Sequence, residues 1–459
     1  MAPPFPETIP ELLAWRRATS PGPWLFSGGD SWTLEDVLGQ VDAYAVGLAE
    51  RGVGRGDRVA LLLGNGPPTL FAWFAANTLG AIAAPLNHAL KVPELAGLLA
   101  LMRPRVLVAD EHSALAEAAC SAAPGGARPL LAKPSELAGA GKGAPRAQVA
   151  PDDVAVLIAT SGTTGTPKAV MQTHRTYCLT AEAFPVWLGL TGADRLLATL
   201  PLFHINAQAY SVMGALGAGG SLALLPRFSA SAFWSEARRL CATQVNVVGA
   251  MLHILLHREP STGDRQHALR VCYAALALPE EQHRAFEERF GLALTVGYGM
   301  SETTFGTVWP RGEVAHYGSI GRLRQHPRLG EINRARVVRE DGSDAADGEA
   351  GELWLANPAT MRGYWDDRAA SAVALAGGWL HTGDLVRRDA DDFYTFVARK
   401  KEIIRRRGEN VAAAEVEGAL LSHPSVAEAA VVGAPSNLGE EEIVAYVAPR
   451  AGAVVDVDA

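Results

Sequence analysis

The segment from Ile158 to Val170 constrains this chain most, because it joins an apolar run to a loop that suits a charged ligand. It reads Ile-Ala-Thr-Ser-Gly-Thr-Thr-Gly-Thr-Pro-Lys-Ala-Val, and residues 154–158 have the apolar pattern of a buried strand. Gly162 and Gly165 allow sharp turns and a close approach of the backbone to a ligand. Successive backbone N–H groups can surround an anion, and Lys168 adds a mobile positive charge. The segment therefore suits a polyphosphate.

The spacing of this loop differs from the P-loop, in which four residues separate the first glycine from Gly-Lys-[Ser/Thr]. Here the order is Ser-Gly-Thr-Thr-Gly-Thr-Pro-Lys. A solvated loop of serine, threonine and glycine is the ordinary alternative, and the segment alone does not decide between the two. The groups available to a phosphate are those of Thr160, Ser161, Gly162, Thr163, Thr164, Gly165 and Thr166.

Length and composition limit the class of protein. A chain of 459 residues is too long for one simple domain and predicts two or three. Its 48% hydrophobic and 20% charged residues are typical of globular enzymes, and a net charge of −8 argues against nucleic acid or an anionic membrane as a partner. The four cysteines lack metal-ligand spacing, as expected of free thiols. Without a recognisable secretory signal or membrane span, we expect a cytoplasmic protein.

The pattern of apolar and amphipathic segments predicts an α/β fold with mostly parallel sheets. A helix is expected from an N-cap at Thr33 to about residue 51, and others over 68–79 and 93–102. They alternate with strands expected over 59–63, 81–85 and 106–110. A second series of strands is expected over 154–158, 195–199, 221–225, 245–248, 271–274 and 294–296. Such alternation implies right-handed βαβ units. Residues 114–148, which are rich in Ala, Gly and Pro, predict a loop-rich connection between the two series.

The pattern changes to short strands and turns from about Gly321. Strands expected over 331–338, 351–355 and 393–397 predict a small β-barrel-like subdomain. A charge run beginning at Arg399 marks a boundary, beyond which a small α/β domain begins. We therefore expect an N-terminal domain over 1–400, with α/β subdomains over 1–150 and 151–320 and the β subdomain over 321–398. An incomplete, mobile C-terminal domain is expected over 401–459.

A second motif, Gly297-Tyr-Gly-Met-Ser-Glu-Thr303, follows an expected strand. Ligands of open α/β sheets bind outside the carboxyl ends of the strands, so its place favours a binding role. Glu302 suits Mg²⁺, a cation that prefers carboxylate and phosphate oxygens. Tyr298 can stack on a purine, and Ser301 can donate a hydrogen bond to a phosphate. A glycine turn with a surface glutamate is the alternative.

Two further motifs offer groups that suit a ribose. Trp379-Leu-His-Thr-Gly-Asp384 holds a carboxylate beside a tight turn, where it can accept both ribose hydroxyls or form an Asx turn between strands. Arg399, which precedes Lys400 and Lys401, suits bidentate contact with ribose or phosphate oxygens. A solvated charge run is the alternative for these three residues.

The four motifs, in this order and spacing, resemble those of the adenylate-forming superfamily, which includes acyl-CoA synthetases, luciferases and peptide-synthetase adenylation domains. The resemblance extends from about Ser31 to the C-terminus. It is closer to acyl-CoA synthetases of the crotonobetaine/carnitine–CoA ligase type, on the segments 202–208, 228–234 and 407–411. It implies that a carboxylic acid and ATP form an acyl-adenylate and pyrophosphate with Mg²⁺, and that the thiol of CoA then displaces AMP. Adenylation with an amine or carrier-protein acceptor, and a non-catalytic nucleotide-binding protein, are the alternatives.

The resemblance also implies roles for individual residues. Lys168, Glu302 and His204 would be catalytic, with Glu302 holding the metal, although a turn histidine is the alternative for His204. Nucleotide contacts, besides the loop and Lys168, would come from Ala275, Leu276, Gly297, Tyr298, Gly299, Met300, Ser301, Asp384 and Arg399. The acyl pocket would be lined by His204, Asn206, Gln208, Ala250, Met251, Gly297, Gly299, Thr303 and Gly306. Lys401 would be the hinge, and Gly408 and Arg405 would contact CoA.

The chain departs from the family pattern in two places. The usual glycine-rich adenine segment reads Ala274-Ala-Leu-Ala-Leu-Pro279 here. The lysine that family members carry near the end of the small domain does not occur after Lys401, so we expect slow adenylate formation by the 459-residue chain. The small pocket residues predict room for a bulky or extended acid, and no acidic residue among them calls for a cationic one. A homodimer is left open.

Overall fold

The computed structural model describes residues 4–20, 22–126, 128–139, 141, 143–160, 167–275, 277–313, 315–406, 409–421, 423–435, 441–450 and 452–453. The chain divides into two compact units. The first unit consists of Met1–Arg334 and Ala356–Leu380, and the second of Ala335–Leu355 and His381–Ala459. The expected boundary near residue 400 therefore lies inside the second unit.

A six-stranded sheet in the first unit has the order β6-β5-β3-β4-β7-β8. Its strands are β3 (Arg58–Leu62), β4 (Ile82–Pro85), β5 (Val106–Ala109), β6 (Leu130–Ala132), β7 (Val154–Thr160) and β8 (Lys168–Thr173). Neighbouring strands are parallel except for the antiparallel pair β7 and β8. The prediction of a mostly parallel sheet is therefore confirmed here.

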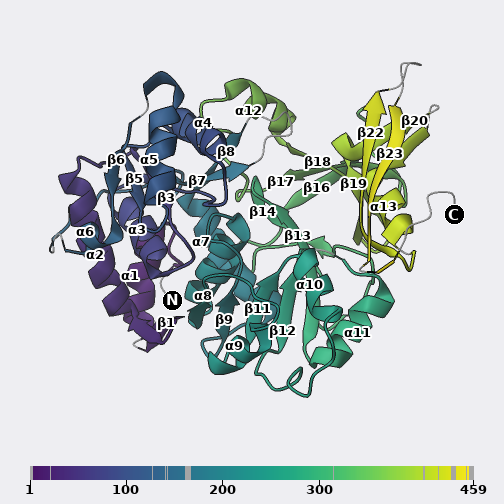
Figure 1. Cartoon of the computed structure of the whole chain (residues 1–459), viewed down its shortest axis with the longest axis horizontal. Coiled ribbons are helices and arrows are strands. Elements are labelled where there is room, and N and C mark those ends of the chain that lie inside the picture. The colour runs from purple at the N-terminus through teal and green to yellow at the C-terminus, as the bar shows by residue number, and fades with distance from the viewer. Residues whose placement is uncertain are drawn as a thin grey trace. The chain divides into compact units, whose positions relative to one another are not determined.

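Both faces of this sheet are covered by helices (Figure 1). Val59 and Leu61 belong to the core that includes α2 (Leu34–Glu50) and α3 (Pro67–Thr78), whereas Ala60 and Leu62 belong to the core that includes α4 (Val92–Met102) and α5 (Ser113–Ala122). Successive side chains of a strand point to opposite faces, so burial on both sides requires an unbroken apolar run. That requirement explains why these strands were predictable.

The start of α2 was also predictable, because its cap is local in sequence. The Thr33 hydroxyl accepts the N–H of Asp36, and the Asp36 carboxylate accepts the N–H of Thr33 at 2.8 Å. This reciprocal capping box satisfies backbone donors that the first helical turn leaves unpaired.

The prediction of a loop-rich connection over 114–148 was wrong for much of that segment. It contains most of α5, the short helix η1 (Pro124–Gly126), β6 and α6 (Pro134–Ala138). Alanine is the strongest helix former, but composition alone grouped it with glycine and proline. Ala116 and Ala119 of α5 are fully buried in the core beside α4.

A nine-stranded sheet, in the order β15-β14-β13-β12-β11-β9-β10-β1-β2, forms the rest of the first unit's framework. Its strands are β1 (Pro23–Ser27), β2 (Asp30–Thr33), β9 (Arg195–Ala198), β10 (Ser221–Leu224), β11 (Gln244–Val247), β12 (Val271–Ala274), β13 (Ala293–Met300), β14 (Thr303–Val308) and β15 (Arg322–Leu323). The central strands pair in parallel, and β2, β14 and β15 pair antiparallel at the edges. The residues of β15 were expected in the small β subdomain, but they extend this sheet instead.

The helices of this part are α1 (Ile9–Thr19), α7 (His174–Leu188), η2 (Asn206–Val212), α8 (Met213–Gly217), α9 (Phe233–Arg239), α10 (Gly249–Leu256), α11 (Glu280–Phe290), α12 (Arg368–Ala374) and η3 (Ala376–Gly378). Among the described residues, no helix has both the length and the apolar character needed to cross a membrane.

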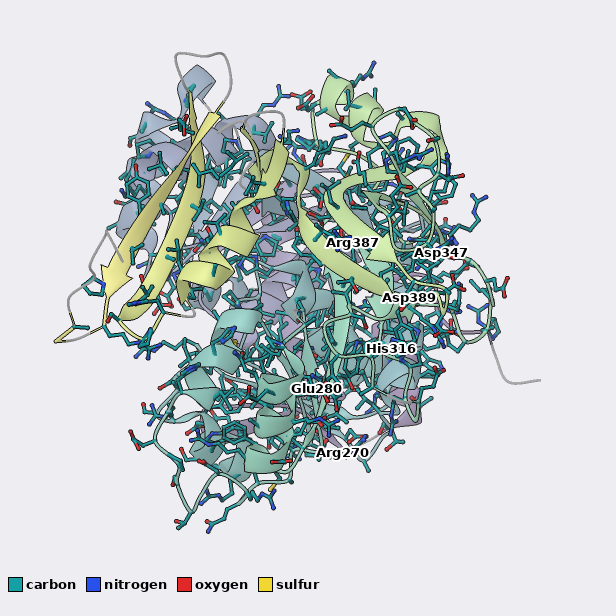
Figure 2. All side chains as sticks on the ribbon, turned by 90° about the vertical axis from the view of Figure 1, so that its right-hand side faces the viewer. Arg270, Glu280, His316, Asp347, Arg387 and Asp389 are labelled. Atoms are coloured by element: carbon teal, nitrogen blue, oxygen red, sulfur yellow. The ribbon has the colours of Figure 1, made fainter. Side chains whose placement is uncertain are left out.

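A buried carboxylate joins the amino ends of three neighbouring strands of this sheet. Asp194 precedes β9, Thr243 precedes β11, and Arg270, which is labelled in Figure 2, precedes β12. Asp194 accepts hydrogen bonds from Thr243 Oγ1 at 2.7 Å and from Arg270 Nη2 at 2.7 Å. Burial alone would raise the pKa of Asp194, but these hydrogen bonds outweigh it and lower the pKa. The ion pair therefore holds the three strands in register at that end.

The second unit begins with a four-stranded sheet in the order β16-β17-β18-β19. Its elements are β16 (Arg334–Val338), β17 (Ala350–Ala356), β18 (Leu380–Arg388), β19 (Tyr394–Arg399), η4 (Lys400–Glu402), β20 (Ile403–Arg406), β21 (Glu409–Ala412), α13 (Ala413–Leu421), β22 (Val426–Pro435) and β23 (Glu441–Pro449). Arg387, near the end of β18, and Asp389, just after it, are labelled in Figure 2. The strands expected from the sequence are present, and a separate small core includes Ile404, Ala413 and Val431.

Candidate functional site

The two ends of the predicted phosphate loop lie side by side. Thr160 at the end of β7 is opposite Lys168 at the start of β8 in the antiparallel ladder. The residues between them that were predicted to contact phosphate, Ser161, Gly162, Thr163, Thr164, Gly165 and Thr166, lie outside the described residues.

Lys168 and Glu302, which are far apart in sequence, are brought together by Tyr364. The Lys168 ammonium lies 4.6 Å from the centre of the Tyr364 ring, within the range of a cation–π interaction. The Tyr364 hydroxyl donates a hydrogen bond to Glu302 Oε1 at 2.9 Å. Burial, reinforced by the negative charge of Glu302, raises the pKa of Tyr364, so the phenol stays protonated and remains a donor. A cation, a phenol and a carboxylate therefore form one connected group.

Backbone hydrogen bonds fix the position of Tyr364 in this group. The N–H of Trp365 donates to the carbonyl of Ala169 at 2.8 Å, next to Lys168 in β8. The N–H of Met361 donates to the carbonyl of Glu302 at 2.7 Å. The segment that carries Tyr364 is thus attached to both of the elements whose side chains it contacts. Sequence reasoning missed Tyr364, because a tyrosine beside a tryptophan reads as core rather than as a site.

The second motif is part of a strand and not a loop after it. Gly297 to Met300 complete β13, and only Ser301 and Glu302 form the turn into β14. Gln172 Nε2 on β8 donates to the Ser301 carbonyl at 2.5 Å, which ties this turn to the strand after the phosphate loop. The expectation that the motif follows the strand was wrong, because a two-residue turn lets the hairpin continue the sheet.

Glycines of the second motif face a buried guanidinium. A Cβ at Gly297 would lie 2.6 Å from Arg324 Nη2, and one at Gly299 would lie 2.6 Å from the Tyr210 hydroxyl. A Cβ at Gly306, on β14, would lie 2.2 Å from the Tyr298 carbonyl oxygen. Close packing therefore requires glycine at all three positions.

His204 lies in a turn that precedes η2. Its N–H donates to the Pro201 carbonyl at 3.0 Å, and its ring centre is 4.5 Å from that of Phe203. Asn65 anchors the approach to this turn, because Nδ2 donates to the Leu200 carbonyl at 2.8 Å. Burial lowers the pKa of His204, so the imidazole is neutral at pH 7. A neutral ring suits a gate beside an anionic substrate better than a proton donor.

The other predicted acyl-pocket residues differ in how their polar atoms are used. The fully buried Gln208 amide accepts from the Tyr177 hydroxyl and donates to the Leu202 carbonyl at 2.6 Å. Thr303 Oγ1 is also fully buried and lies 3.3 Å from Asn357 Oδ1, to which it donates. Asn206 Oδ1, by contrast, is buried without a hydrogen-bond partner among the described residues. Ala250 and Met251 lie in the first turn of α10, which is Gly249–Leu256.

In the second unit, Asp384 and Arg399, which were both predicted to hold the ribose, form an ion pair with each other. Arg399 Nε lies 2.9 Å from Asp384 Oδ1, across the β18–β19 ladder in which the two residues are direct partners. Gly383 has φ +72°, a conformation that favours glycine, and its N–H donates to Glu352 Oε1 at 3.0 Å. Lys400 Nζ lies 3.1 Å from Glu352 Oε2.

The remaining predicted residues are placed only in part. Lys401 lies in η4, Ala275 follows β12, and the backbone of Arg405 belongs to β20. Leu276 and Gly408 lie outside the described residues.

The predicted metal ligand of the site is one carboxylate, that of Glu302, and not a cluster of ligands. Within the described part of the chain, no group of three or more His, Cys, Asp or Glu side chains could hold a metal ion. Mg²⁺ in nucleotide sites is usually held by one or two carboxylates together with phosphate oxygens and water. Glu302, which is oriented by Tyr364 and lies near Lys168, fits that kind of binding.

Two relatives show what kind of proteins resemble this chain. The sulfoacetate–CoA ligase of Cupriavidus necator is 37% identical over 469 residues, which cover 98% of this chain and 89% of that protein. The crotonobetaine/carnitine–CoA ligase of Escherichia coli K12 is 33% identical over 425 residues, which cover 87% of this chain and 80% of that protein.

Solved structures match the fold over nearly the whole chain. The crystal structure of the anthranilate CoA ligase AuaEII in complex with anthranoyl-AMP has a TM-score of 0.88 at 26% identity, covering 99% of this chain and 89% of that one. The O-succinylbenzoate coenzyme A synthetase of Bacillus subtilis, in complex with ATP and a magnesium ion, has a TM-score of 0.84 at 28% identity, covering 96% and 89%.

Two family models match the chain, one over most of its length and one over its C-terminal part. The model of the AMP-binding enzyme family matches residues 14–365, and that of the AMP-binding enzyme C-terminal domain matches residues 415–459. The first match spans the phosphate loop, the β13 motif and Tyr364. The chain therefore belongs to the AMP-binding enzyme family, as its motifs predicted.

Proposed function

We propose that this protein is an AMP-forming acid–thiol ligase. It activates a carboxylic acid with ATP to an acyl-adenylate, releases pyrophosphate, and transfers the acyl group to the thiol of CoA. The observation that carries the proposal is the connected group Lys168–Tyr364–Glu302 at the end of the phosphate loop. Its relatives are CoA ligases, and a CoA ligase of similar fold binds an acyl-AMP.

The chemistry needs charge to be offset at the phosphates. A carboxylate oxygen attacks the α-phosphorus, the bond to pyrophosphate breaks, and negative charge moves onto the leaving oxygens. Lys168 stabilises that charge, and the residues of the loop from Thr160 to Thr166 orient the phosphates. A magnesium ion, when bound, withdraws charge from the same oxygens. Glu302 would hold it, and Tyr364 keeps the Glu302 carboxylate in place.

Other residues bind the rest of the substrates. Tyr298, on the face of β13 opposite Gly297 and Gly299, lies against the adenine. Asp384 accepts the ribose hydroxyls, and Arg399 forms an ion pair with that carboxylate. The remaining residues predicted for the nucleotide, the acyl pocket, the Lys401 hinge and CoA keep those roles in this proposal. A cytoplasmic location, the absence of nucleic acid as a partner and an open choice between monomer and homodimer belong to it as well.

ATP–pyrophosphate exchange over a panel of carboxylic acids tests the first half-reaction, and thioester formation with CoA tests the second. We expect exchange that depends on the acid and on Mg²⁺, and a thioester only when CoA is present. Lys168→Ala should lower exchange about 100-fold or more, because a charge contact made in the transition state is lost. Lys91→Ala, which removes an exposed lysine outside this group, is the matched control.

Three results would count against the proposal. Exchange without any acid would mean that the nucleotide is not used to activate one. An adenylate that reacts with an amine or a carrier protein, but not with CoA, would keep the adenylation and change the acceptor. ATP binding without exchange for any acid would indicate a nucleotide-binding protein that has no ligase activity.

A further inference from the structure

Within the described part of the chain, Arg324 is a charged side chain buried without a counter-ion. Its exposed fraction is 0%, and none of the charges that act on it comes from an Asp or Glu of those residues. A buried ionised group without an opposite charge is costly, and proteins keep one there only where other interactions offset that cost. Burial lowers the pKa of Arg324, but a guanidinium stays protonated in proteins.

The contacts that Arg324 makes are all to neutral groups. Nε donates to the Thr307 carbonyl at 2.6 Å, and Nη1 donates to the Thr304 carbonyl at 2.9 Å and to the Tyr210 hydroxyl at 2.7 Å. Nη2 donates to the Tyr273 hydroxyl. These contacts fix the plane of the guanidinium, and its carbon lies 5.0–5.3 Å from the ring centres of Trp187, Tyr210 and Tyr273, but none of these groups carries a negative charge.

Two donors at one edge of this group have no acceptor among the described residues. A guanidinium has two N–H bonds at Nη2, and only one of them is used by Tyr273. The Tyr273 hydroxyl, which is 1% exposed, accepts that bond, so its own hydrogen needs a separate acceptor. Both donors lie 2.6 Å from the place where a Cβ of Gly297 would be.

That edge faces Gly297, which was predicted to line the acyl pocket. Gly297 and Gly299 lie on the same face of β13, because they are two residues apart, and Tyr298 lies on the opposite face. The two glycines were predicted to line the acyl pocket, and Tyr298 to lie against the adenine. The guanidinium of Arg324 therefore lies on the face of β13 that was predicted to bind the acid. Tyr210, which contacts it, belongs to η2, the helix that follows the His204 turn.

We propose that Arg324, with the hydroxyl of Tyr273, binds a second anionic group of the acid substrate, a carboxylate or a sulfonate. The acid is then a short molecule with one carboxylate for adenylation and another oxyanion at its far end. This inference rests on the proposed function and specifies its substrate class. The unused N–H of Arg324 Nη2 and the O–H of Tyr273 are two adjacent donors, which suit either oxyanion because both present two oxygens. Two relatives differ here: one is named for sulfoacetate, which carries a sulfonate, and the other for a betaine.

The test uses the full chain and pairs of acids that differ in the second charge. Malonate, succinate, sulfoacetate and 3-sulfopropionate are compared with propionate and butyrate in ATP–pyrophosphate exchange. We expect kcat/KM for at least one dianion to exceed that of the monoanions by about 100-fold, because a buried ionic contact is gained. The dicarboxylates and the sulfonates show which oxyanion is preferred.

Two variants tie that preference to Arg324. Arg324→Met, which keeps the length and apolar stem but removes the charge, should lower kcat/KM for the dianion about 100-fold or more and change that for butyrate only a few-fold. Tyr273→Phe, a smaller change, should lower the ratio of kcat/KM for the dianion to that for butyrate about 10-fold. Thermal unfolding and ATP binding of each variant show whether it is folded.

The outcomes separate the inference from the proposed function. Exchange with monoanions only, or an equal loss for all acids in a folded Arg324→Met variant, overturns the inference and leaves the ligase activity standing. If no acid supports exchange, calorimetric titration of the chain with the dianions shows whether Arg324 binds their second anionic group. Binding that the folded Arg324→Met and Tyr273→Phe variants weaken supports the inference, and no binding to the unaltered chain overturns it.

Discussion

At the residue scale, the group Lys168–Tyr364–Glu302 is the feature on which activity should depend most. Tyr364 contributes in two ways, since its ring contacts the Lys168 ammonium and its hydroxyl contacts the Glu302 carboxylate. The two contributions are separable, because phenylalanine keeps the ring and loses the hydroxyl.

Replacing Tyr364 by Phe should lower kcat/KM about 10- to 100-fold, as a hydrogen bond to a charged group contributes about 1.5–3 kcal/mol. The Mg²⁺ concentration for half-maximal exchange should rise as well, because Glu302 is less well oriented. Tyr364→Ala should lower kcat/KM further, because it also removes the ring that contacts the Lys168 ammonium. Equal activity of Tyr364→Phe and the unaltered chain would show that the hydroxyl has no such role; unfolding temperatures serve as the control.

His174 supplies a prediction about pH. It is buried, its Nδ1 accepts the N–H of Ile9 at 3.3 Å, and burial lowers its pKa from 6.5 to about 4. Between pH 6.5 and 4 the unfolded chain therefore binds a proton that the folded chain does not, so stability falls as the pH falls through that window. The full difference is about 3 kcal/mol.

His174→Asn should remove this part of the pH dependence, because Asn can accept the same hydrogen bond and does not titrate. Urea unfolding of both proteins between pH 7.5 and about 4 measures it. The free energy of unfolding of the variant should change less with pH across that window. Parallel curves for the two proteins would contradict the assignment.

At the scale of elements, the nine-stranded sheet has a structural ion pair at the amino ends of its central strands, and the predicted binding groups of β13 lie toward the opposite ends. Asp194 and Arg270 precede β9 and β12, at the amino ends of parallel strands. Ligands of such sheets bind beyond the carboxyl ends. Stability and activity should therefore respond separately to changes at the two ends.

Asp194→Asn should lower the free energy of unfolding by about 2–4 kcal/mol, because it leaves the charge of Arg270 without its partner. Exchange activity at 25 °C should stay within a few-fold, since the pair is remote along the strands from the β13 motif. Thermal unfolding and exchange kinetics of the same preparation test both statements. The double variant Asp194→Asn with Arg270→Met should recover part of the lost stability; a further loss would argue against the pair as the cause.

At the scale of the whole molecule, charge is unevenly distributed. The chain carries a net charge of −8, yet residues 399–407 include Arg399, Lys400, Lys401 and three arginines. ATP and CoA are anions, so the overall field opposes their approach and a local basic segment favours it.

If this segment attracts the phosphates of CoA, the KM for CoA should rise severalfold between about 50 and 500 mM salt, as screening shortens the range of the attraction. Pantetheine, which has the same thiol arm and no phosphate, is the matched control and should show a smaller rise. Thioester formation at saturating ATP and acid gives both values. An equal salt response for the two thiols would assign these arginines to a solvated face.

Much of the fold was predictable from the sequence because its causes are local. Strands buried on both faces need unbroken apolar runs, and α2 begins where Thr33 and Asp36 cap it, so these elements were found close to their true limits. The segment 114–148 was misread, because its alanines support α5 only through burial beside α4. Motif order identified the family, which the family models confirmed.

The sequence by itself determined the α/β fold, the family and the chemical types at the site, since spacing and residue type act over short distances. Only the tertiary structure placed Tyr364 between Lys168 and Glu302, and Arg324 behind Gly297. Those contacts join residues 27 to 196 positions apart. No short-range sequence pattern predicts these contacts, because they form only after β8, β13 and the neighbouring strands have paired.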